Sequence, residues 1–454
     1  MRDYGFSWTL QAISEAAHGE LIGKDCAISG LSTDTRGIGP GQVFVALVGD
    51  RFDGHDFIKQ ACQQGAMAVV VSKPIDCDCA QIRVGDTRVA LGFIAQAWRK
   101  RFAIPLIAVT GSNGKTTVKE MLSAIMSVRH TTLSTQGNLN NDIGVPLTLL
   151  RLRDKHTCAV IEMGANHPNE IAYLTRLALP TVALVNNAAA AHLAGFASLE
   201  GVARAKGEIY SGLDNNGTAI INADDRYAQL WQSMCAGKKI LRFGLDNPAE
   251  VSADWQSDET GSHIDLHTPQ GSISISLGVP GRHNVMNALA ASAAALAAGA
   301  SLEEICSGLQ LMRSVAGRLQ IKPGLAGSRI LDDTYNANPA SLRVALDVLQ
   351  QFDGRHFLAL GDMAELGEDA EQLHREAGQV ARDSGVDRLY TVGELARFAA
   401  TSFGHDAYSY SDQPSMISAL HDDLSMDVTL LVKGSRLAHM EKVVQALTIN
   451  GETG

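Results

Sequence analysis

The sequence predicts a three-domain α/β protein, and three observations lead to that fold class. The chain has 454 residues, a length that suits two to four domains. From about residue 84 onward, short β-rich apolar runs alternate with segments whose apolar residues recur at helical spacing. Alternation on this scale produces parallel sheets with right-handed crossovers. Hydrophobic residues make up 45% of the chain and charged residues 19%, which suits a compact soluble enzyme.

The three predicted domains differ in their elements. Residues 1–83 are expected to form a smaller N-terminal α/β domain of short strands and turns, with a helix near 57–65 before the strand AMAVVV. Residues 84–316 are expected to form a P-loop ATPase-type domain around a parallel sheet. Residues 317–454 are expected to form a Rossmann-like α/β domain with the strands RILDD, HFLALGD, RLYTVG and TLLVKGS.

The central domain is predicted in the most detail. Its expected strands are 106–109, 158–163, 181–186, 218–222 and 238–244. A β-rich insertion is expected near 250–279, followed by a buried Ala-rich helix at 288–300. That helix is too short to span a bilayer.

Charge and cysteine content exclude several classes of protein. The chain has 38 basic and 49 acidic residues, a formal charge of −11, so a general nucleic-acid surface is not expected. Seven scattered cysteines indicate reduced thiols in a cytosolic protein, and the isolated pair Cys77 and Cys79 favours a surface loop over a metal site. The first twenty residues are too polar and acidic for a signal peptide. We therefore expect a cytoplasmic protein without membrane insertion.

One stretch of the central region carries a phosphate-binding pattern. The run LIAV at 106–109 leads into a glycine-bounded loop, and a helix with an apolar stripe is expected from Thr117. Glycines let amide N–H groups turn inward, and a helix start carries a partial positive charge. In such a loop Lys115 reaches the β- and γ-phosphates and the Thr116 hydroxyl lies on Mg²⁺. The residues expected to hold a nucleotide are Gly111, Ser112, Asn113, Gly114, Lys115, Thr116 and Thr117.

A simpler interpretation of this stretch is an ordinary Gly-Asn turn before a helix. The usual P-loop pattern also has a glycine where this chain has Val109. The placement of Gly-Lys-Thr-Thr between a strand and a helix favours the nucleotide.

Polar residues end or follow the neighbouring strands of the predicted sheet. They are Glu162, Asn186, Asn187, Asn222 and Asp224. Ligands of open parallel sheets lie outside the carboxyl ends of the strands, so these side chains should share an edge with the phosphate loop. A carboxylate there can bind Mg²⁺, which takes few protein ligands beside phosphate oxygens and water. Glu162 is therefore the candidate metal ligand, and a strand-end salt bridge is the alternative.

His192 and Lys206 are less informative from the residues alone. Lys206 lies in a helix expected to start near Ser198, where a lysine is usually exposed or near a helix end. An isolated histidine is usually structural. Spacing alone assigns neither residue a role.

A series of motifs changes this interpretation. They are VTGSNGKTT, EMGAN, NNAAAAHL, ARAKGEI, GRHNVMNALAA, AGRL and DDTYNANPAS. In their order and spacing, over essentially its whole length, the chain resembles the Mur ligases, the ATP-dependent enzymes that extend the peptidoglycan precursor peptide. The loop of that family also lacks the first P-loop glycine, which accounts for Val109.

Within that family, the segments DDTYNANP, STDTR, FVALVGDRFDGHDF and ALGDMAELG resemble the member that adds a terminal dipeptide. The single-amino-acid ligase carries a Tyr-Ala-His-Thr-Pro-type element, and the related folylpolyglutamate synthetase carries an Asp-Gly-Ala-His-Asn-Pro-type element. Neither element occurs here. These two enzymes remain the alternatives within the family.

The resemblance implies roles at the ATP site. It places Lys115 on the ATP phosphates and Thr116 on a first Mg²⁺. It places Glu162 and His192 on Mg²⁺ between ATP and the acyl substrate, which makes two metal ions. It also implies that Lys206 is carbamylated, because an ammonium repels Mg²⁺ whereas a carbamate offers anionic oxygen.

The resemblance also assigns contacts outside the phosphate loop. Asn287 is implied to contact adenine. Arg318, at the junction with the third domain, and Asp333 are implied to reach ATP from that domain, with Asp332 as the alternative to Asp333. The residues implied to contact the UDP-sugar peptide are Ser32, Thr33, Asp34, Arg36, Asn138, Asn140 and Asn141.

The implied substrates are UDP-N-acetylmuramoyl-tripeptide and D-Ala-D-Ala, and the implied reaction proceeds through an acyl phosphate. The segment Lys433 to Arg436, including Ser435, offers cations and backbone N–H groups for the dipeptide carboxylate. Its basic residues are equally consistent with solvated charges at a helix start. We expect a monomer, and the third peptide residue (diaminopimelate or lysine) stays open.

Two other functions fit part of the sequence. A P-loop kinase acting on a hydroxyl accounts for the loop and Glu162 but leaves the DDTYNANP region without a role. A nucleotide-gated binding module needs the loop but not the aligned His192, Lys206 and Arg318.

Overall fold

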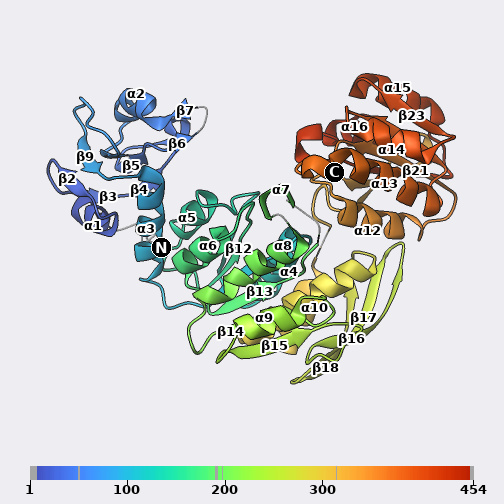
Figure 1. The fold of residues 1–454 in the computed structure, drawn as a ribbon. Coiled ribbons are helices and arrows are strands. Elements are labelled where there is room, and N and C mark those ends of the chain that lie inside the picture. Colours follow the sequence, from blue (N-terminus) through green and yellow to red (C-terminus); the bar gives the residue numbers. More distant parts are fainter. Residues whose placement is uncertain (1–7, 50–51, 190–192, 197, 313, 450–454) are drawn as a thin grey trace.

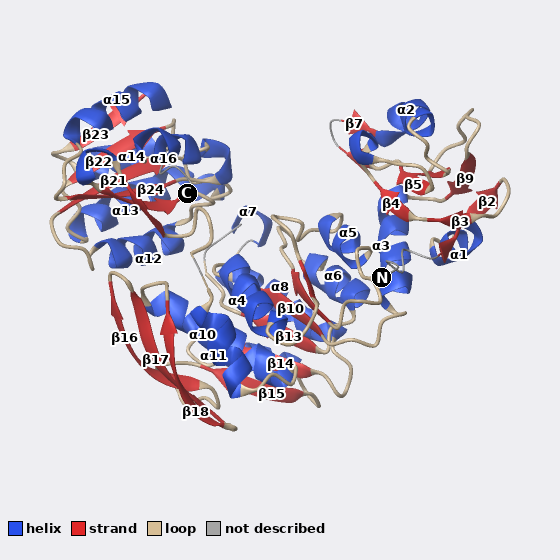
Figure 2. Ribbon diagram, turned by 180° about the vertical axis from the view of Figure 1, so that it is seen from behind, coloured by secondary structure: helices blue, strands red, loops and turns tan. Residues whose placement is uncertain are grey.

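The computed structural model describes residues 8–49, 52–189, 193–196, 198–312 and 314–449. Three regions with their own sheets follow one another along the chain, and the first and third rise on opposite sides of the second (Figure 1). Figure 2 shows the same arrangement from behind, with helices against the sheets of all three. The predicted fold class is confirmed. The predicted limits at 83 and 316 fall directly after β9 and shortly before β19, and the domain boundaries stay predictions.

The N-terminal region is built on a five-stranded sheet with the order β2-β9-β8-β5-β4. These strands are β2 (Glu20–Ile22), β9 (Ala80–Arg83), β8 (Ala68–Val71), β5 (Gln42–Val45) and β4 (Gly30–Ser32). The pairs are parallel except for β2 with β9. The smaller elements are α1 (Leu10–Ala16), α2 (Ile58–Gln63), β1 (Trp8–Thr9) with β3 (Ala27–Ile28), and β6 (Val48–Gly49) with β7 (Phe52–Asp53). The predicted helix and the strand after it are confirmed.

One prediction for this region is wrong. Cys62 of α2 and Cys79, directly before β9, form a disulfide with a Cα–Cα separation of 6.4 Å, whereas the cysteine count indicated reduced thiols. The chain returns through β8 before it reaches Cys79, so the pairing depends on tertiary structure that the spacing of the cysteines does not show. Cys77 is a free thiol.

The central region contains a six-stranded parallel sheet with the order β11-β12-β10-β13-β14-β15. Its strands are β10 (Leu106–Thr110), β11 (Thr132–Ser134), β12 (Cys158–Glu162), β13 (Val182–Val185), β14 (Thr218–Asn222) and β15 (Lys239–Phe243). Every residue of β10, β12 and β13 is buried. Such strands belong to a sheet covered on both faces.

Helices cover the two faces of this sheet. Leu106 and Ala108 pack into a core with α3 (Thr87–Arg99), α5 (Gly144–Leu149), α6 (Glu170–Ala178), α8 (Leu199–Gly207) and α9 (Ala228–Met234). Ile107 and Val109 face the other core, with α4 (Lys115–Ser127), α10 (Arg282–Ala297) and α11 (Leu302–Gln310). The alternation of these residues follows from the two-residue period of a strand. The short helix α7 (Leu193–Phe196) precedes α8.

The insertion and the Ala-rich helix were predicted with inexact limits. The insertion is an antiparallel sheet of β16 (Ser252–Asp258), β17 (Gly261–Thr268) and β18 (Gly271–Leu277). The helix α10 begins at Arg282, earlier than predicted, after Gly281 with its φ of 94°. Most of its residues are buried, so the helix lacks the alternation of polar and apolar faces by which its first turn could have been predicted.

The C-terminal region contains a second six-stranded sheet, ordered β19-β20-β24-β21-β22-β23. Its strands are β19 (Gln320–Pro323), β20 (Arg329–Asp333), β21 (Arg355–Gly361), β22 (Arg388–Val392), β23 (Ala407–Tyr410) and β24 (Val428–Lys433). Its helices are α12 (Pro339–Leu349), α13 (Ala370–Asp383), α14 (Ala396–Phe403), α15 (Gln413–Asp423) and α16 (Glu441–Leu447). The four predicted strands are confirmed. The two edge strands β19 and β23 were not predicted. Across the described residues, no helix combines the length and apolar character needed to cross a membrane.

Candidate active site

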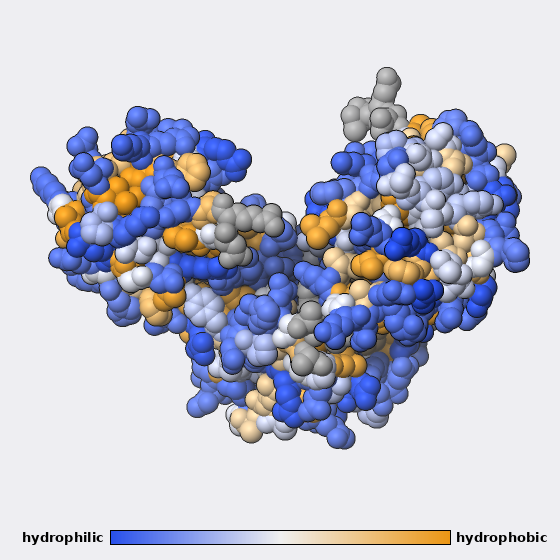
Figure 3. Space-filling model, turned by 45° about the horizontal axis from the view of Figure 1, so that its top comes forward, coloured by the Kyte–Doolittle hydropathy of each residue, from blue (hydrophilic) through white to orange (hydrophobic). Residues whose placement is uncertain are grey.

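A cavity of about 1240 Å³ lies where the central and C-terminal regions meet. Figure 3 shows the surface hollowed between the N-terminal and C-terminal regions, which rise on opposite sides of the central region. The central region contributes the phosphate loop, the carboxyl ends of its strands and the segment 137–142. The C-terminal region contributes residues 335–338, 364–366 and 435–437. The predicted sheet edge is therefore one wall of a cavity with a second α/β domain opposite it.

The phosphate loop lies between β10 and α4, as predicted. Gly111 has a φ of 154° and Gly114 a φ of 77°, and the latter is a left-handed conformation that favours glycine. A side chain at Gly114 would meet the amides of Asn186 and Asn287 at 2.5 Å. Only glycine fits this position. The helix α4 begins at Lys115, two residues before the predicted start.

Lys115 lies at the centre of this loop. Its ammonium donates to the carbonyl oxygens of Gly111 at 2.7 Å and Ser112 at 3.1 Å. Burial lowers the pKa of Lys115, and the carboxylate of Glu162 opposes that shift. The ammonium is thus already in the position from which it can exchange carbonyl oxygens for phosphate oxygens.

Two asparagines at the end of β13 hold the loop in place. The Asn186 amide donates to the carbonyl oxygen of Asn113 at 3.0 Å, and the backbone N–H of Asn113 donates to Asn187 Oδ1 at 2.9 Å. Asn186 also donates to Asn287 Oδ1 at 3.0 Å. Asn222 donates to the Asn186 carbonyl oxygen at 2.9 Å. These strand-end residues support the phosphate loop from behind.

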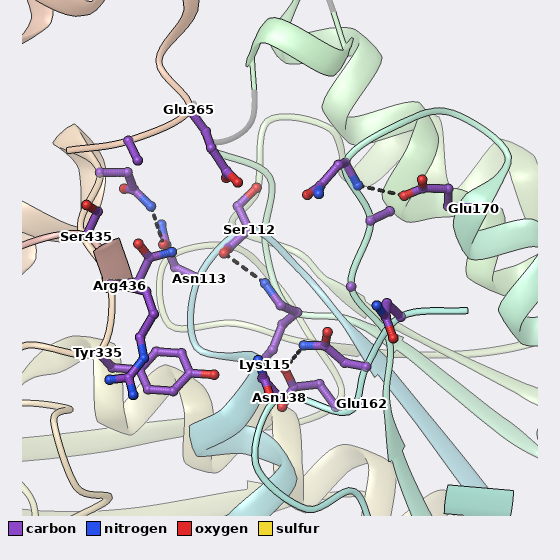
Figure 4. Close-up of a pocket in the computed structure, with 18 of the residues that line it drawn as sticks. Ser112, Asn113, Lys115, Asn138, Glu162, Glu170, Tyr335, Glu365, Ser435 and Arg436 are labelled. Atoms are coloured by element: carbon purple, nitrogen blue, oxygen red, sulfur yellow. Dashed lines mark hydrogen bonds between the residues drawn. The ribbon is translucent and has the colours of Figure 1, made fainter. Parts of the chain in front are cut away.

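Glu162 has the features of a cation ligand. It is 2% exposed, and its Oε1 accepts a hydrogen bond from Asn140 at 2.8 Å. Its Oε2 is buried without a hydrogen-bond partner, which is costly unless a ligand satisfies it. Figure 4 shows Glu162 and Lys115 close together in the pocket. The described residues contain no cluster of three or more His, Cys, Asp or Glu that could hold a metal, so a cation here would depend on phosphate oxygens and water. Mg²⁺ is usually bound in that way.

Lys206 is buried in the same cavity, with an exposed fraction of 1%. Burial, together with the nearby ammonium of Lys115, lowers its pKa to about 7. The helix α8 starts as predicted, because the Ser198 hydroxyl caps it by accepting the N–H of Gly201 at 3.0 Å. Lys206 is therefore an amine with a much larger uncharged fraction than an exposed lysine, and it lines the cavity together with the phosphate loop. His192, the other residue assigned with it, lies outside the described residues.

Two residues join the C-terminal region to the phosphate loop. Arg318 donates to the Thr116 hydroxyl at 3.4 Å and stacks on Tyr335 at 4.1 Å. Asn338 donates to Asn113 Oδ1 at 3.0 Å. The Nε of Arg318 is buried without a partner and can donate to an anion in the cavity. Arg318 lies between α11 and β19, and its role toward ATP stays a prediction, whereas Tyr335 and Asn338 lie in the motif DDTYNANPAS without an assigned role.

Asn287 and Asp333 lie beside the cavity but are not among the residues that line it. The Asn287 amide oxygen is bonded to Asn186. Asp333 is 7% exposed and forms an ion pair with Lys433, and Asp332 pairs with Lys322 at 2.7 Å. Their roles toward ATP stay predictions.

The substrate residues divide into two groups. Asn138, Asn140, Asn141, Ser435 and Arg436 line the cavity. Ser32, Thr33, Asp34 and Arg36 do not; they lie in and after β4, where Asp34 and Arg36 form an exposed ion pair at 2.7 Å. Lys433, expected as a cation for the dipeptide carboxylate, is instead 1% exposed and bound to Asp333.

The fold and this cavity define a P-loop nucleotide-binding protein whose phosphate site faces a second α/β domain. Family models match the chain in three stretches: the Mur ligase family catalytic domain over residues 27–130, the Mur ligase middle domain over 109–295 and the Mur ligase glutamate ligase domain over 317–436. The chain belongs to the Mur ligase family.

Individual relatives support the same assignment. The chain is 46% identical to the UDP-N-acetylmuramoyl-tripeptide–D-alanyl-D-alanine ligase of Escherichia coli (strain K12), over 98% of this chain and 99% of the relative. A crystal structure of MurF from Acinetobacter baumannii is 38% identical with a TM-score of 0.93 and covers 97% of this chain and 99% of its own. MurF ligase from Thermotoga maritima in complex with ADP is 28% identical with a TM-score of 0.84, over 92% and 96% of the two chains.

Proposed function

We propose that the chain is an ATP-dependent ligase that adds D-alanyl-D-alanine to UDP-N-acetylmuramoyl-tripeptide in the synthesis of peptidoglycan precursors. One observation carries the proposal: Lys115, Glu162, Lys206 and Arg318 meet in one cavity of a chain that matches a ligase of that activity from end to end. The reaction requires ATP, and we place it in the cytoplasm, where ATP and nucleotide-linked precursors are available.

The reaction consists of two transfers. An oxygen of the tripeptide carboxylate attacks the γ-phosphorus of ATP, the bond from phosphorus to the β–γ bridging oxygen breaks, and ADP leaves. The ammonium group of D-Ala-D-Ala gives up one proton to solvent, and the resulting amine attacks the carbonyl carbon of the acyl phosphate. The tetrahedral intermediate collapses with cleavage of the C–O bond, and phosphate leaves with the electron pair and takes up the second proton of the nitrogen.

Cations of the cavity overcome the repulsion between the two anionic reactants. Lys115 exchanges its carbonyl partners for β- and γ-phosphate oxygens, and Arg318 directs its unpartnered Nε to the same charge. Such preorganised donors stabilise charge that develops in the transition state. Arg318 extends from the segment that joins the two domains, so it completes the site only when the C-terminal domain is in place.

The residues present fit Mg²⁺, and we propose that two ions bind. Thr116 Oγ1 would hold the first, and the unpartnered Glu162 Oε2, together with His192 and a Lys206 carbamate, would hold the second. Bound Mg²⁺ would neutralise phosphate charge and hold the attacking oxygen in line with the γ-phosphorus. The low pKa of Lys206 supports the carbamate, because CO₂ reacts with an uncharged amine.

The substrates enter the cavity from different domains. Ser435 and Arg436 are proposed to bind the carboxylate of D-Ala-D-Ala: the Ser435 hydroxyl is buried without a partner, and Arg436 is largely exposed. Ser32, Thr33, Asp34 and Arg36 are proposed to contact the UDP-sugar, with the peptide arm reaching Asn138, Asn140 and Asn141. Closure around the reactants would exclude water, which otherwise hydrolyses the acyl phosphate.

Product analysis tests this proposal. The protein is incubated with ATP, Mg²⁺ and UDP-N-acetylmuramoyl-tripeptide, with and without D-Ala-D-Ala, and products are resolved by mass spectrometry. We expect ADP, phosphate and the UDP-linked pentapeptide only in the complete mixture. Hydroxylamine in place of the dipeptide should trap the acyl phosphate as a hydroxamate. A stable phosphorylated product without an amine would instead support a kinase, and nucleotide binding without turnover would support a binding module. Parallel reactions with diaminopimelate- and lysine-containing acceptors identify the third residue.

A further inference from the structure

Glu365 is the single carboxylate among the described residues that line the C-terminal wall of the cavity. It lies four residues beyond the end of β21 and is exposed. Figure 4 shows its carboxylate pointing into the pocket, in the direction of Ser112 of the phosphate loop. Neither the motifs nor the steps above assign it a role.

The backbone holds Glu365 in this orientation. Its φ is 62°, a left-handed conformation that a non-glycine residue adopts only when the surrounding structure imposes it. Met363 and Leu366 on either side are 0% and 4% exposed and pack into the core of the C-terminal region. The Met363 N–H donates to the buried His374 Nε2 at 3.0 Å. The turn therefore places two apolar anchors inward and one carboxylate outward.

The loop that carries Glu365 is tied to the loop that carries Ser435 and Arg436. The strands β21 and β24, which lead into these loops, are parallel neighbours. The Ser435 N–H donates to the carbonyl oxygen of Asp362 at 2.9 Å. The two loops therefore present opposite charges on the same wall of the cavity.

We propose that Glu365 binds the ammonium group of D-Ala-D-Ala while Ser435 and Arg436 bind its carboxylate. The inference rests on the proposed function. The dipeptide is a zwitterion, and charge-assisted hydrogen bonds at both ends orient it along one direction only. Its amine is then the end that faces the phosphate loop, where the acyl phosphate forms.

The other carboxylates that line the described cavity lie on its central side. Asp142 pairs with Arg88, and Glu170 accepts the backbone N–H groups of Asn166 at 2.7 Å and His167 at 3.2 Å. Glu162 faces Lys115 and is the candidate metal ligand. All three belong to the central region, so none of them moves with the C-terminal domain. Glu365 does, and it can deliver the amine as that domain closes.

Steady-state kinetics of Glu365→Gln test the inference. The substitution keeps the size of the side chain and removes its charge. We expect KM for D-Ala-D-Ala to rise about tenfold or more, while KM for ATP and KM for the UDP-tripeptide stay unchanged. Glu368→Gln is the matched control, because Glu368 is an exposed glutamate of the adjacent turn (Gly367–Asp369) that does not line the cavity.

A second substrate separates the two ends of the dipeptide. D-alanyl-D-alaninamide keeps the ammonium and lacks the carboxylate. With this analogue the effect of Glu365→Gln should persist, whereas the effect of Arg436→Gln should disappear. Wild-type protein that makes no pentapeptide would overturn the proposed function itself. Wild-type activity combined with a Glu365→Gln variant that matches Glu368→Gln, or that raises all three KM values equally, would overturn the role of Glu365 alone.

Discussion

Lys206 combines burial, a pKa lowered to about 7 and a place opposite the phosphate loop. If its carbamate holds a cation, Lys206→Ala should be nearly inactive and partly rescued by a short-chain carboxylic acid that enters the vacated space. Lys206→Arg should not be rescued, because a guanidinium keeps the repelling charge and fills the site. Turnover with and without added acetate measures the difference. Equal activity of the two variants at every acetate concentration would contradict the carbamate.

Glu162 offers a second test of a single residue, because the charge that serves catalysis should also reduce the thermal stability of the protein. Glu162→Gln keeps an acceptor for Asn140 and removes a buried charge with an unpartnered oxygen. We expect activity to fall by about 100-fold or more and thermal stability to stay the same or rise. Calorimetry and a ligase assay on the same preparation check both. A clear loss of stability would mean that Glu162 is a structural residue.

The positions of site residues could be predicted from the sequence where neighbouring residues of the chain alone determine the local structure. The loop with Lys115 and Thr116 and the strand-end Glu162 are of this kind, since strand, turn and helix are continuous in the chain. Asn338 and Glu365 were not predicted. Both lie in quoted motifs, DDTYNANPAS and ALGDMAELG, but their roles depend on an interdomain hydrogen bond and on an unusual φ, which a motif does not reveal.

At the scale of elements, α13 is attached to the loop after β21 through a buried histidine. His374 is 0% exposed; its Nδ1–H donates to Ala370 O at 2.6 Å, and its Nε2 accepts the Met363 N–H. Burial lowers the pKa of His374, although Asp362 opposes the shift. The imidazole must be neutral to accept that N–H.

The free energy of unfolding should therefore depend on pH. Because the pKa of His374 is lower in the folded state, the unfolded chain binds more protons below its ordinary pKa of 6.5. This contribution is present above pH 6.5 and decreases as the pH falls below it, by at most about 1.4 kcal/mol per pH unit. Urea midpoints at pH 7.5 and 5.5 measure it. Burial also lowers the pKa of His283, to about 4, so His283 adds a similar dependence of the free energy of unfolding on pH. The substitution His374→Gln should therefore reduce this pH dependence without abolishing it. An unchanged pH dependence would contradict the prediction.

Elements with a strong local pattern could be predicted, and elements defined by their neighbours could not. The strands β10, β12 and β13 are continuous apolar runs because both of their faces are buried. The edge strand β23 alternates little in burial and depends on its pairing with β22. The helix α10 follows Gly281, and its polar first turn of Arg282, His283 and Asn284 leads into a mostly buried, Ala-rich run without a polar stripe.

At the scale of the whole molecule, Asn338 joins the C-terminal region to the phosphate loop. Its Nδ2 donates to Asn113, and its Oδ1 caps α12 by accepting the N–H of Ser341 at 2.8 Å. Asn338→Ser keeps the cap but is too short to reach Asn113. We expect nucleotide affinity to fall roughly two- to tenfold, the effect of one lost hydrogen bond, with an unchanged melting temperature.

Calorimetric titration with a non-hydrolysable ATP analogue measures that affinity. Asn338→Asp is the matched variant, because a carboxylate caps the helix equally well and has no proton to donate. Asn338→Ala should lose both the cap and the interdomain bond. Nucleotide affinity equal to that of the wild type in both capping variants would show that the bond does not couple the domains.

The number of domains follows from strand–helix alternation, but their placement does not. The disulfide between Cys62 and Cys79 and the ion pair between Glu259 and Arg329, at 2.7 Å, join residues that only the tertiary structure brings together. The latter links the turn between β16 and β17 to the first residue of β20, so the antiparallel insertion contacts the C-terminal region.

The hydrogen bonds of Lys115 have a consequence for how nucleotide comes and goes. Its ammonium donates to Gly111 O and Ser112 O, so these carbonyl oxygens compete with phosphate oxygens for Lys115. A nucleotide that binds to Lys115 must displace these two carbonyl groups. Its affinity therefore depends on how much more strongly the ammonium binds phosphate oxygens than carbonyl oxygens. When the γ-phosphoryl group has been transferred, ADP carries less charge and the carbonyl groups compete more effectively. The two carbonyl oxygens that accept from Lys115 should therefore weaken the binding of ADP more than the binding of ATP, which favours release of the product.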